Sequence, residues 1–104
     1  MMLTVIESPT YLRSIAGIWS DDEAAEFVDF IAANPDAGDV IAGTRGLRKV
    51  RWTRAGMGKR GGARAIYLWR DARGQVLLLM AYTKTKFDNL PAEFLNRLKE
   101  QYDA

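Results

Sequence analysis

The chain has 104 residues, a formal net charge of +2, and neither cysteine nor histidine. Its length suits a single domain over residues 1–104, and a hydrophobic content of 48% is sufficient for an ordinary two-layer core. The missing residue types exclude disulfides, thiolate nucleophiles, cysteine-ligated zinc and a histidine general base, so any catalysis must use Lys, Arg, Tyr, Asp, Glu, Ser or Thr.

The N-terminal third predicts a short strand followed by two helices. Residues 2–7 have the composition of a strand. Ser8 and Pro9 are typical of a helix start, with serine at the N-cap and proline at the first helical position, and the apolar spacing continues to Ile18. Residues 20–23 form a capping box that opens a second helix, which the Asn-Pro pair at 34–35 ends.

Three strands and a helix are predicted after a loop at 34–44. The strands at 47–54, 64–71 and 75–83 would form an antiparallel meander, and the last is a continuous apolar run typical of a central strand covered on both faces. Pro91 opens the final helix. The order β-α-α-β-β-β-α predicts an α+β fold, with a small, mainly antiparallel sheet and helices packed on one face.

Charge is strongly segregated along the chain. Residues 1–39 have a net charge of −7, residues 40–70 a net charge of +9, and the remainder is neutral. The stretch 46–67, GLRKVRWTRAGMGKRGGARAIY, carries seven cations and no acid. A surface of one sign concentrates polyanions, so this stretch indicates a nucleic-acid partner, with a merely solvated basic surface as the alternative.

The glycine-rich segment 56–62 does not predict a nucleotide-binding P-loop. Such a loop needs a lysine followed by Ser or Thr between a strand and a helix, whereas Lys59 is followed by Arg60 and then by a strand. The glycines are more simply explained as the wide end of a hairpin.

Period-two alternation sorts the cations of the predicted strands onto faces. Arg48 lies on one face of its strand, and Lys49 and Arg51 lie on the other. On the next strand, Arg64 shares a face with Ile66 and Leu68 and would project from an otherwise apolar surface. Arg64 either pairs with an acid from the helices or contacts a ligand.

Nothing in the sequence predicts an export signal or a membrane span. The N-terminus has no cationic region followed by a long apolar run, and the longest apolar run, at 76–82, is too short to cross a bilayer. We therefore expect a cytoplasmic protein that requires no membrane.

Three segments together resemble a known family. They are the loop and strand at 34–52, the arginine that opens RAIY at 64–67, and YTKTKFDNL at 82–90. In order and spacing they resemble the RelE/ParE toxin superfamily, specifically its HigB-type, RelE-like branch, and the resemblance covers essentially the whole chain.

The resemblance implies the toxin of a type II toxin–antitoxin module, with a RelE-like fold. RelE-like members are ribosome-dependent endoribonucleases that cut mRNA, so the expected partners are the ribosome, mRNA and a cognate antitoxin, here a helix-turn-helix protein. No metal or other cofactor is expected. ParE-like members instead inhibit DNA gyrase without catalysis, and a plain RNA-binding module is a third alternative.

Cleavage of RNA by its own 2′-hydroxyl requires removal of a proton, stabilisation of extra charge on phosphorus, and protonation of the leaving 5′-oxygen. Arginine suits the second task and lysine the first or third. The resemblance assigns catalytic roles to Arg64, Lys84 and Lys86. The other cations of the basic stretch are expected to bind RNA: Arg48, Lys49, Arg51, Arg54, Lys59 and Arg60.

One departure from the family concerns tyrosine. Some RelE toxins use a tyrosine near the C-terminus, where this chain has Phe87, while Tyr102 falls in the last helix. We expect Tyr67 and Tyr82 to be core or sheet-face residues. Asp88 either caps a helix or serves as a second general base.

Overall fold

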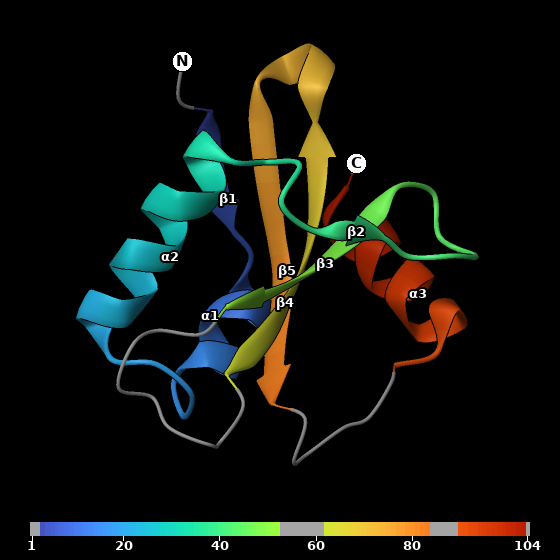
Figure 1. Cartoon of the computed structure of the whole chain (residues 1–104). Helices are drawn as coiled ribbons and strands as arrows, with labels where there is room; N and C mark the ends of the chain where they lie inside the picture. The colour runs from blue at the N-terminus through green and yellow to red at the C-terminus, as the bar shows by residue number, and fades with distance from the viewer. Residues whose placement is uncertain (1–2, 53–61, 84–89, 104) are drawn as a thin grey trace.

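Within the described residues, the sheet has five strands and is flanked by three helices (Figure 1). The computed structural model describes residues 3–52, 62–83 and 90–103. The strand order is β1-β5-β4-β3-β2, with β1 parallel to β5 and every other pair antiparallel. In chain order the elements are β1 (Thr4–Glu7), α1 (Pro9–Ile15), α2 (Asp21–Ala33), β2 (Asp39–Val40), β3 (Leu47–Trp52), β4 (Ala63–Arg70), the 3₁₀ turn η2 (Asp71–Arg73), β5 (Gln75–Thr83) and α3 (Ala92–Tyr102).

The predicted α+β class and the antiparallel meander of β3, β4 and β5 are confirmed. One strand was missed, because the two residues of β2 lie in a segment predicted as a loop. They pair with Lys49 and Arg48 of β3, and two residues are too few to show a periodic pattern. No helix within the described segments is long and apolar enough to cross a bilayer.

The helix starts are confirmed in detail. Ser8 caps α1 by accepting a hydrogen bond from the Tyr11 N–H at 3.0 Å, and Pro9 occupies the first helical position. Ser20 and Glu23 form the reciprocal capping box of α2, at 2.8 and 3.2 Å. The first helix is shorter than predicted, since it ends at Ile15 and the chain then turns into α2.

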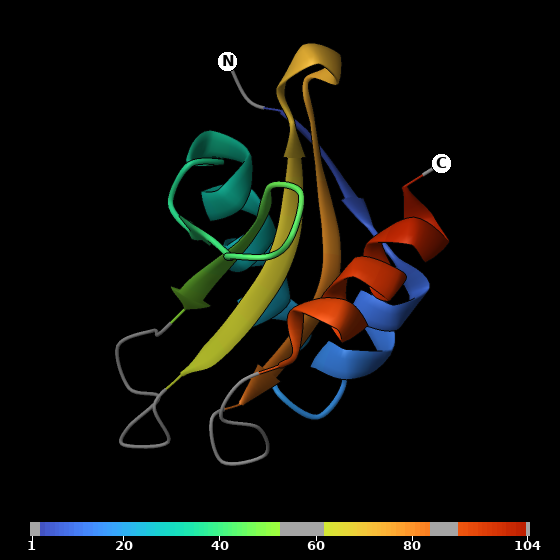
Figure 2. The same cartoon turned by 90° about the vertical axis from the view of Figure 1, so that its right-hand side faces the viewer.

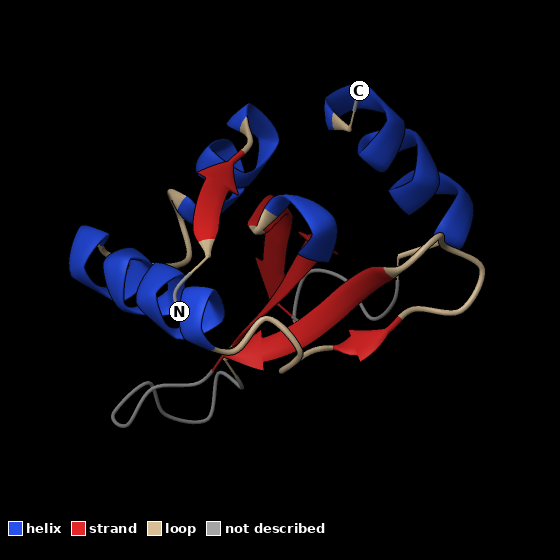
Figure 3. Cartoon of the chain, turned by 90° about the horizontal axis from the view of Figure 1, so that it is seen from above, coloured by secondary structure: helices blue, strands red, loops and turns tan. Residues whose placement is uncertain are grey.

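The helices cover both faces of the sheet, which corrects the expectation that they pack on one face. Helices α1 and α2 pack on one face, while Leu95 and Leu98 of α3 pack on the other against a second apolar cluster (Figures 2 and 3). The physical reason lies in β5, whose side chains are apolar on both faces. Each face must be removed from water, and a single helical layer covers only one.

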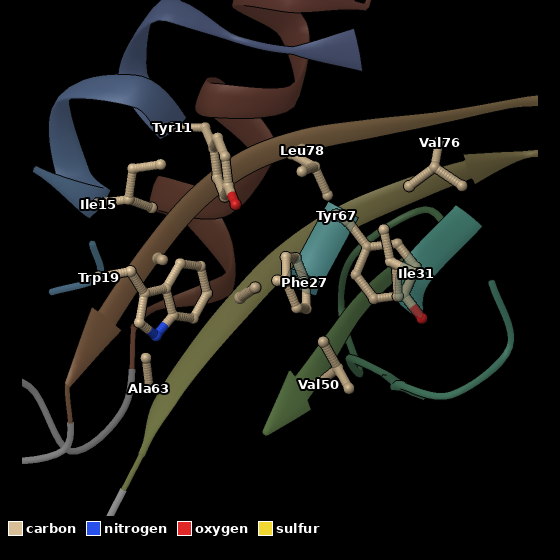
Figure 4. Packing of buried hydrophobic residues seen from close by; sticks show 12 residues of the cluster. Tyr11, Ile15, Trp19, Phe27, Ile31, Val50, Ala63, Tyr67, Val76 and Leu78 are labelled. Carbon is tan, nitrogen blue, oxygen red and sulfur yellow. The ribbon is translucent and has the colours of Figure 1, made fainter. Parts of the chain in front are cut away.

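Phe27 is fully buried in the larger cluster, between α2 and the sheet (Figure 4). Its ring centroid lies 5.1 Å from that of Trp19 and 5.6 Å from that of Trp52. These separations are within the range in which aromatic rings attract each other beyond their simple burial. The aromatic cluster therefore fixes α2 against the ends of β3 and β4.

Strand β5 extends beyond its parallel partner, and α1 covers part of the edge that β1 leaves. The register of β1 ends at Leu78. Beyond that point Ser8 Oγ donates to the Leu79 carbonyl at 3.2 Å, and the Ala81 N–H donates to Ser14 Oγ at 2.9 Å. Two serines thus provide the hydrogen bonds that a longer strand would otherwise supply, because backbone groups at a covered edge need partners.

Three buried tyrosines make stability sensitive to alkaline pH. Burial raises the pKa of Tyr11, Tyr67 and Tyr82 above the ordinary value of 10, and the charge of Glu7 adds to the effect at Tyr11. Below pH 10 both the folded and the unfolded chain keep these protons. Above pH 10 the unfolded chain releases them first, so the free energy of unfolding is expected to fall as pH rises.

Tyr11→Phe tests this expectation. The Tyr11 hydroxyl is buried without a hydrogen-bond partner among the described residues, so its removal breaks no bond in that part of the chain. We expect urea denaturation to give a smaller loss of stability between pH 8 and pH 11 for the variant than for the parent. An equal loss in both proteins would contradict the assignment.

Candidate functional site

Arg64 lies on the face of the sheet that α3 shares. Its neighbours Ala63 and Ala65 point into the larger cluster under α1 and α2, whereas Ile66 and Leu68 belong to the α3 cluster. Alternation along β4 therefore places Arg64 on the α3 face, together with Ile66 and Leu68, whose face it was predicted to share.

The register brings two further side chains beside Arg64. Arg51 of β3 is its direct partner on one side, and Tyr82 of β5 is its partner on the other. Lys49 is paired with Ile66 one step along, so it lies on the same face as Arg51 and Arg64. We call Lys49, Arg51 and Arg64 the cationic face.

Two arginines placed directly opposite each other repel, and this repulsion must be offset. Within the described residues no acid forms an ion pair with Arg64, so the helix-acid alternative finds no support there. One guanidinium nitrogen, Arg64 Nη1, is buried and has no hydrogen-bond partner in the same part of the chain. A buried donor of this kind is costly unless an acceptor reaches it, and an anion would satisfy both the donor and the charge.

Tyr82 supports the position of Arg64. Only 3% of its surface is exposed. Burial raises the pKa of Tyr82, and the nearby positive charge of Arg64 opposes that rise. The phenol is therefore neutral at pH 7. Its position on the sheet beside Arg64 is consistent with the sheet-face role predicted from the sequence.

No family model matches the sequence. The structure is similar to the E. coli toxin RelE, solved as a double mutant in the free state, with a TM-score of 0.60 and 13% identity over 85% of this chain and 90% of that chain. The chain has a RelE-like fold.

Two toxin–antitoxin complexes give the same result. A chain of the RelBE2 complex from Mycobacterium tuberculosis matches with a TM-score of 0.58 and 19% identity, covering 80% of this chain and 99% of that one. A chain of the intact E. coli RelBE complex matches with a TM-score of 0.56 and 13% identity, covering 76% and 93%. The RelE-like fold is therefore nearly complete in this chain, although sequence identity is low.

Within the RelE-like fold, Arg48 lies apart from the cationic face. It is on the opposite side of β3, where its Nη1 donates to the Gly38 carbonyl at 2.7 Å and its guanidinium lies 5.7 Å from the centre of the Trp69 ring. The hydrogen bond holds the loop before β2 against the sheet, and the contact with Trp69 positions the guanidinium between β3 and β4. These contacts give Arg48 a structural role, and the RNA contact expected from the sequence stays a prediction.

Tyr67 also holds the loop before β2 in place through its hydroxyl. Its hydroxyl donates to the Pro35 carbonyl at 2.7 Å and accepts from the Gly38 N–H at 2.9 Å. Glycine is required at position 38, because a Cβ there would lie 2.9 Å from the backbone carbonyl of Lys49.

Tyr67→Phe is expected to lower the free energy of unfolding by about 1–3 kcal/mol, since two buried backbone groups lose their partner. Thermal and urea denaturation measure the change. Tyr102→Phe is a matched control, because that hydroxyl shares a part-buried hydrogen bond with Thr10 and accepts an exposed one from Gln101, and its loss should cost clearly less. Equal losses would show that the loop does not depend on Tyr67.

Several predicted site residues lie outside the described residues: Arg54, Lys59, Arg60, Lys84, Lys86, Phe87 and Asp88. The points where their segments join the sheet are nevertheless defined. Trp52, Ala63 and Thr83 are cross-strand neighbours, one position beyond the row of Arg51, Arg64 and Tyr82. Both segments therefore join the sheet at the same end of β3, β4 and β5, next to the row that contains Arg64.

The described residues contain no cluster of three or more acidic side chains that could hold a metal ion. Sequence reasoning did not associate Tyr82 with Arg64, because period two assigns a face to each side chain but does not fix the register between strands. The chemistry available at the described site is the binding of an anion by a half-buried arginine, with Arg51 and Lys49 adding positive charge.

Proposed function

We propose that this protein is the toxin of a type II toxin–antitoxin module and cleaves mRNA on the ribosome as an endoribonuclease without a metal. The observation that carries the proposal is the buried Nη1 of Arg64, which has no hydrogen-bond partner among the described residues and lies on a face lined by Arg51 and Lys49. The RelE-like fold supports it, since the structures it resembles are those of the toxin RelE and of RelBE toxin–antitoxin complexes.

The proposed reaction is transesterification within the RNA. The 2′-oxygen attacks phosphorus as a base removes its proton, and the bond from phosphorus to the 5′-oxygen breaks as that oxygen gains a proton. The products are a 2′,3′-cyclic phosphate and a 5′-hydroxyl. Arg64 stabilises the extra negative charge that develops on the phosphoryl oxygens. Lys84 and Lys86 are the proposed proton carriers, because amines surrounded by other cations give up a proton more readily.

The remaining cations have a docking role in this proposal. Lys49 and Arg51, with Arg54, Lys59 and Arg60, would hold the RNA backbone of the ribosome or of the message. The cognate antitoxin is proposed to be a small helix-turn-helix protein, as for HigB-type toxins, acting in the cytoplasm.

Purified protein added to translating ribosomes tests the function. We expect new mRNA 5′-ends, mapped by primer extension, that depend on the ribosome and persist in the presence of a metal chelator. A gyrase supercoiling assay is run in parallel. Inhibition of gyrase without mRNA cleavage would overturn the proposal in favour of a ParE-like activity, and salt-dependent RNA binding without cleavage would leave only an RNA-binding module.

A further inference from the structure

A pocket of about 370 Å³ lies between the end of α1 and the end of β5. It is distinct from the cationic face, although Tyr82, which lines the pocket, is the cross-strand partner of Arg64. Its volume is within the range of small-molecule sites, and its lining combines apolar groups with a few polar ones, which is the usual character of such sites. The lining includes Arg13, Gly17, Ile18, Ala81, Tyr82 and Thr83.

The pocket exists because the edge of β5 is only partly covered. Ser8 and Ser14 bond that edge at Leu79 and Ala81, and the chain then turns away through residues 16–18 into α2. Position 17 is glycine, and a Cβ built there meets no atom within 4 Å. A side chain at position 17 would therefore meet no steric obstacle at its Cβ.

Arg13 supplies positive charge at this pocket. Its Nη2 donates to Thr10 Oγ1 at 3.3 Å, which orients an otherwise exposed guanidinium. Planar guanidinium groups stack on nucleobases as well as binding phosphate, so an arginine beside an apolar hollow suits a nucleotide better than it suits a purely apolar ligand.

The pocket is close to Arg64. Tyr82 lines it and is also the cross-strand partner of Arg64. Adjacent strands are about 4.8 Å apart, so the outer edge of β5 lies within roughly 10 Å of the backbone of Arg64. When Arg64 binds a phosphate of an RNA strand, the adjacent nucleotide can therefore reach this pocket.

We propose that this pocket binds the nucleobase of a single-stranded RNA nucleotide next to the phosphate that Arg64 holds. The inference rests on the proposed function, since it gives that reaction a base-binding subsite. In this arrangement Arg13 stacks on or bonds the base, Ile18 and Ala81 contact its apolar face, and Tyr82 separates the base from the phosphate.

Gly17→Phe tests the subsite by filling it. Because the space around position 17 is open, the ring is expected to enter the pocket without displacing the fold. We expect the KM for mRNA cleavage on ribosomes to rise roughly tenfold or more with kcat within about twofold, since base contacts of this kind act mainly on binding. Ala16→Phe places the same ring at an exposed neighbouring position outside the lining and is expected to leave KM unchanged.

A second measurement does not depend on cleavage. In NMR titrations of the full-length protein, 5′-UMP and 5′-AMP are expected to shift the amide signals of Gly17, Ile18 and Thr83, whereas inorganic phosphate should leave them in place. Arg13→Gln should weaken these shifts, and Arg97→Gln, on the exposed surface of α3, should not.

The outcomes separate this proposal from the proposed function. Absence of mRNA cleavage by the parent protein, with nucleotide shifts at Gly17 retained, overturns the enzyme and keeps the subsite. Three other results would each overturn the subsite. The first is equal shifts from phosphate and from nucleotides, and the second is equal effects of Gly17→Phe and Ala16→Phe. The third is a Gly17→Phe defect that is confined to antitoxin binding.

Discussion

Arg64→Ala is expected to lower mRNA cleavage by roughly a hundredfold to a thousandfold, the usual effect of removing one donor that stabilises charge in a transition state. Arg64→Lys should fall between the two, because lysine keeps the charge but loses the planar fork that contacts two phosphate oxygens. The measurement is the rate of appearance of mRNA 5′-ends on translating ribosomes, together with growth arrest after induction.

Stability distinguishes this role from a structural one. The Arg64 Nη1 is buried without a partner in the described part of the chain, so truncation removes a costly group, and the midpoint of thermal unfolding should be unchanged or higher. Arg97→Ala, at an exposed site on α3, is the control for general loss of charge. Unchanged cleavage in Arg64→Ala, or a loss of activity that follows a loss of stability, would rule out the proposed role.

Phe27→Ala is expected to have the largest effect on the fold, a loss of about 3–5 kcal/mol in the free energy of unfolding. Phe27 is fully buried, and the truncation leaves a cavity between the rings of Trp19 and Trp52. Urea denaturation, followed by circular dichroism at low temperature, measures the loss.

Phe94→Ala provides a matched control for Phe27→Ala. Phe94 is the same residue type in a helix, but 38% of its surface is exposed. Its truncation opens no enclosed cavity, so the loss should be several-fold smaller. Similar losses of stability in the two variants would show that the aromatic cluster is not the main apolar contact of α2.

The element order was predictable because each boundary has a local chemical cause. The serine caps of α1 and α2 and the apolar run of β5 act through neighbouring residues, and they were placed correctly. The side of the sheet on which α3 packs was predicted incorrectly. An amphipathic helix shows which of its sides is apolar, but the sheet face it covers depends on the connection through residues 84–91.

The candidate site, like the fold, was only partly predictable from the sequence. Alternation placed Arg64 on the same face as Ile66 and Leu68, and these two residues line the cluster under α3. The pairing of Arg64 with Arg51 and Tyr82 was not predictable, because it depends on the register of three strands, which a wide connection such as 53–62 does not fix. Arg48 resembled its cationic neighbours in sequence, and only the position of Gly38 and Trp69 reveals its different contacts.

The parallel pairing of β1 with β5 has a consequence for the time at which the candidate site is assembled. Thr4 pairs with Gln75, 71 positions later, so the first strand synthesised must wait for one of the last. Long-range pairing of this kind slows folding. Arg64 likewise acquires its neighbour Tyr82 only when β5 joins the sheet. A nascent chain therefore has no assembled candidate site until β5 has been synthesised and has joined the sheet.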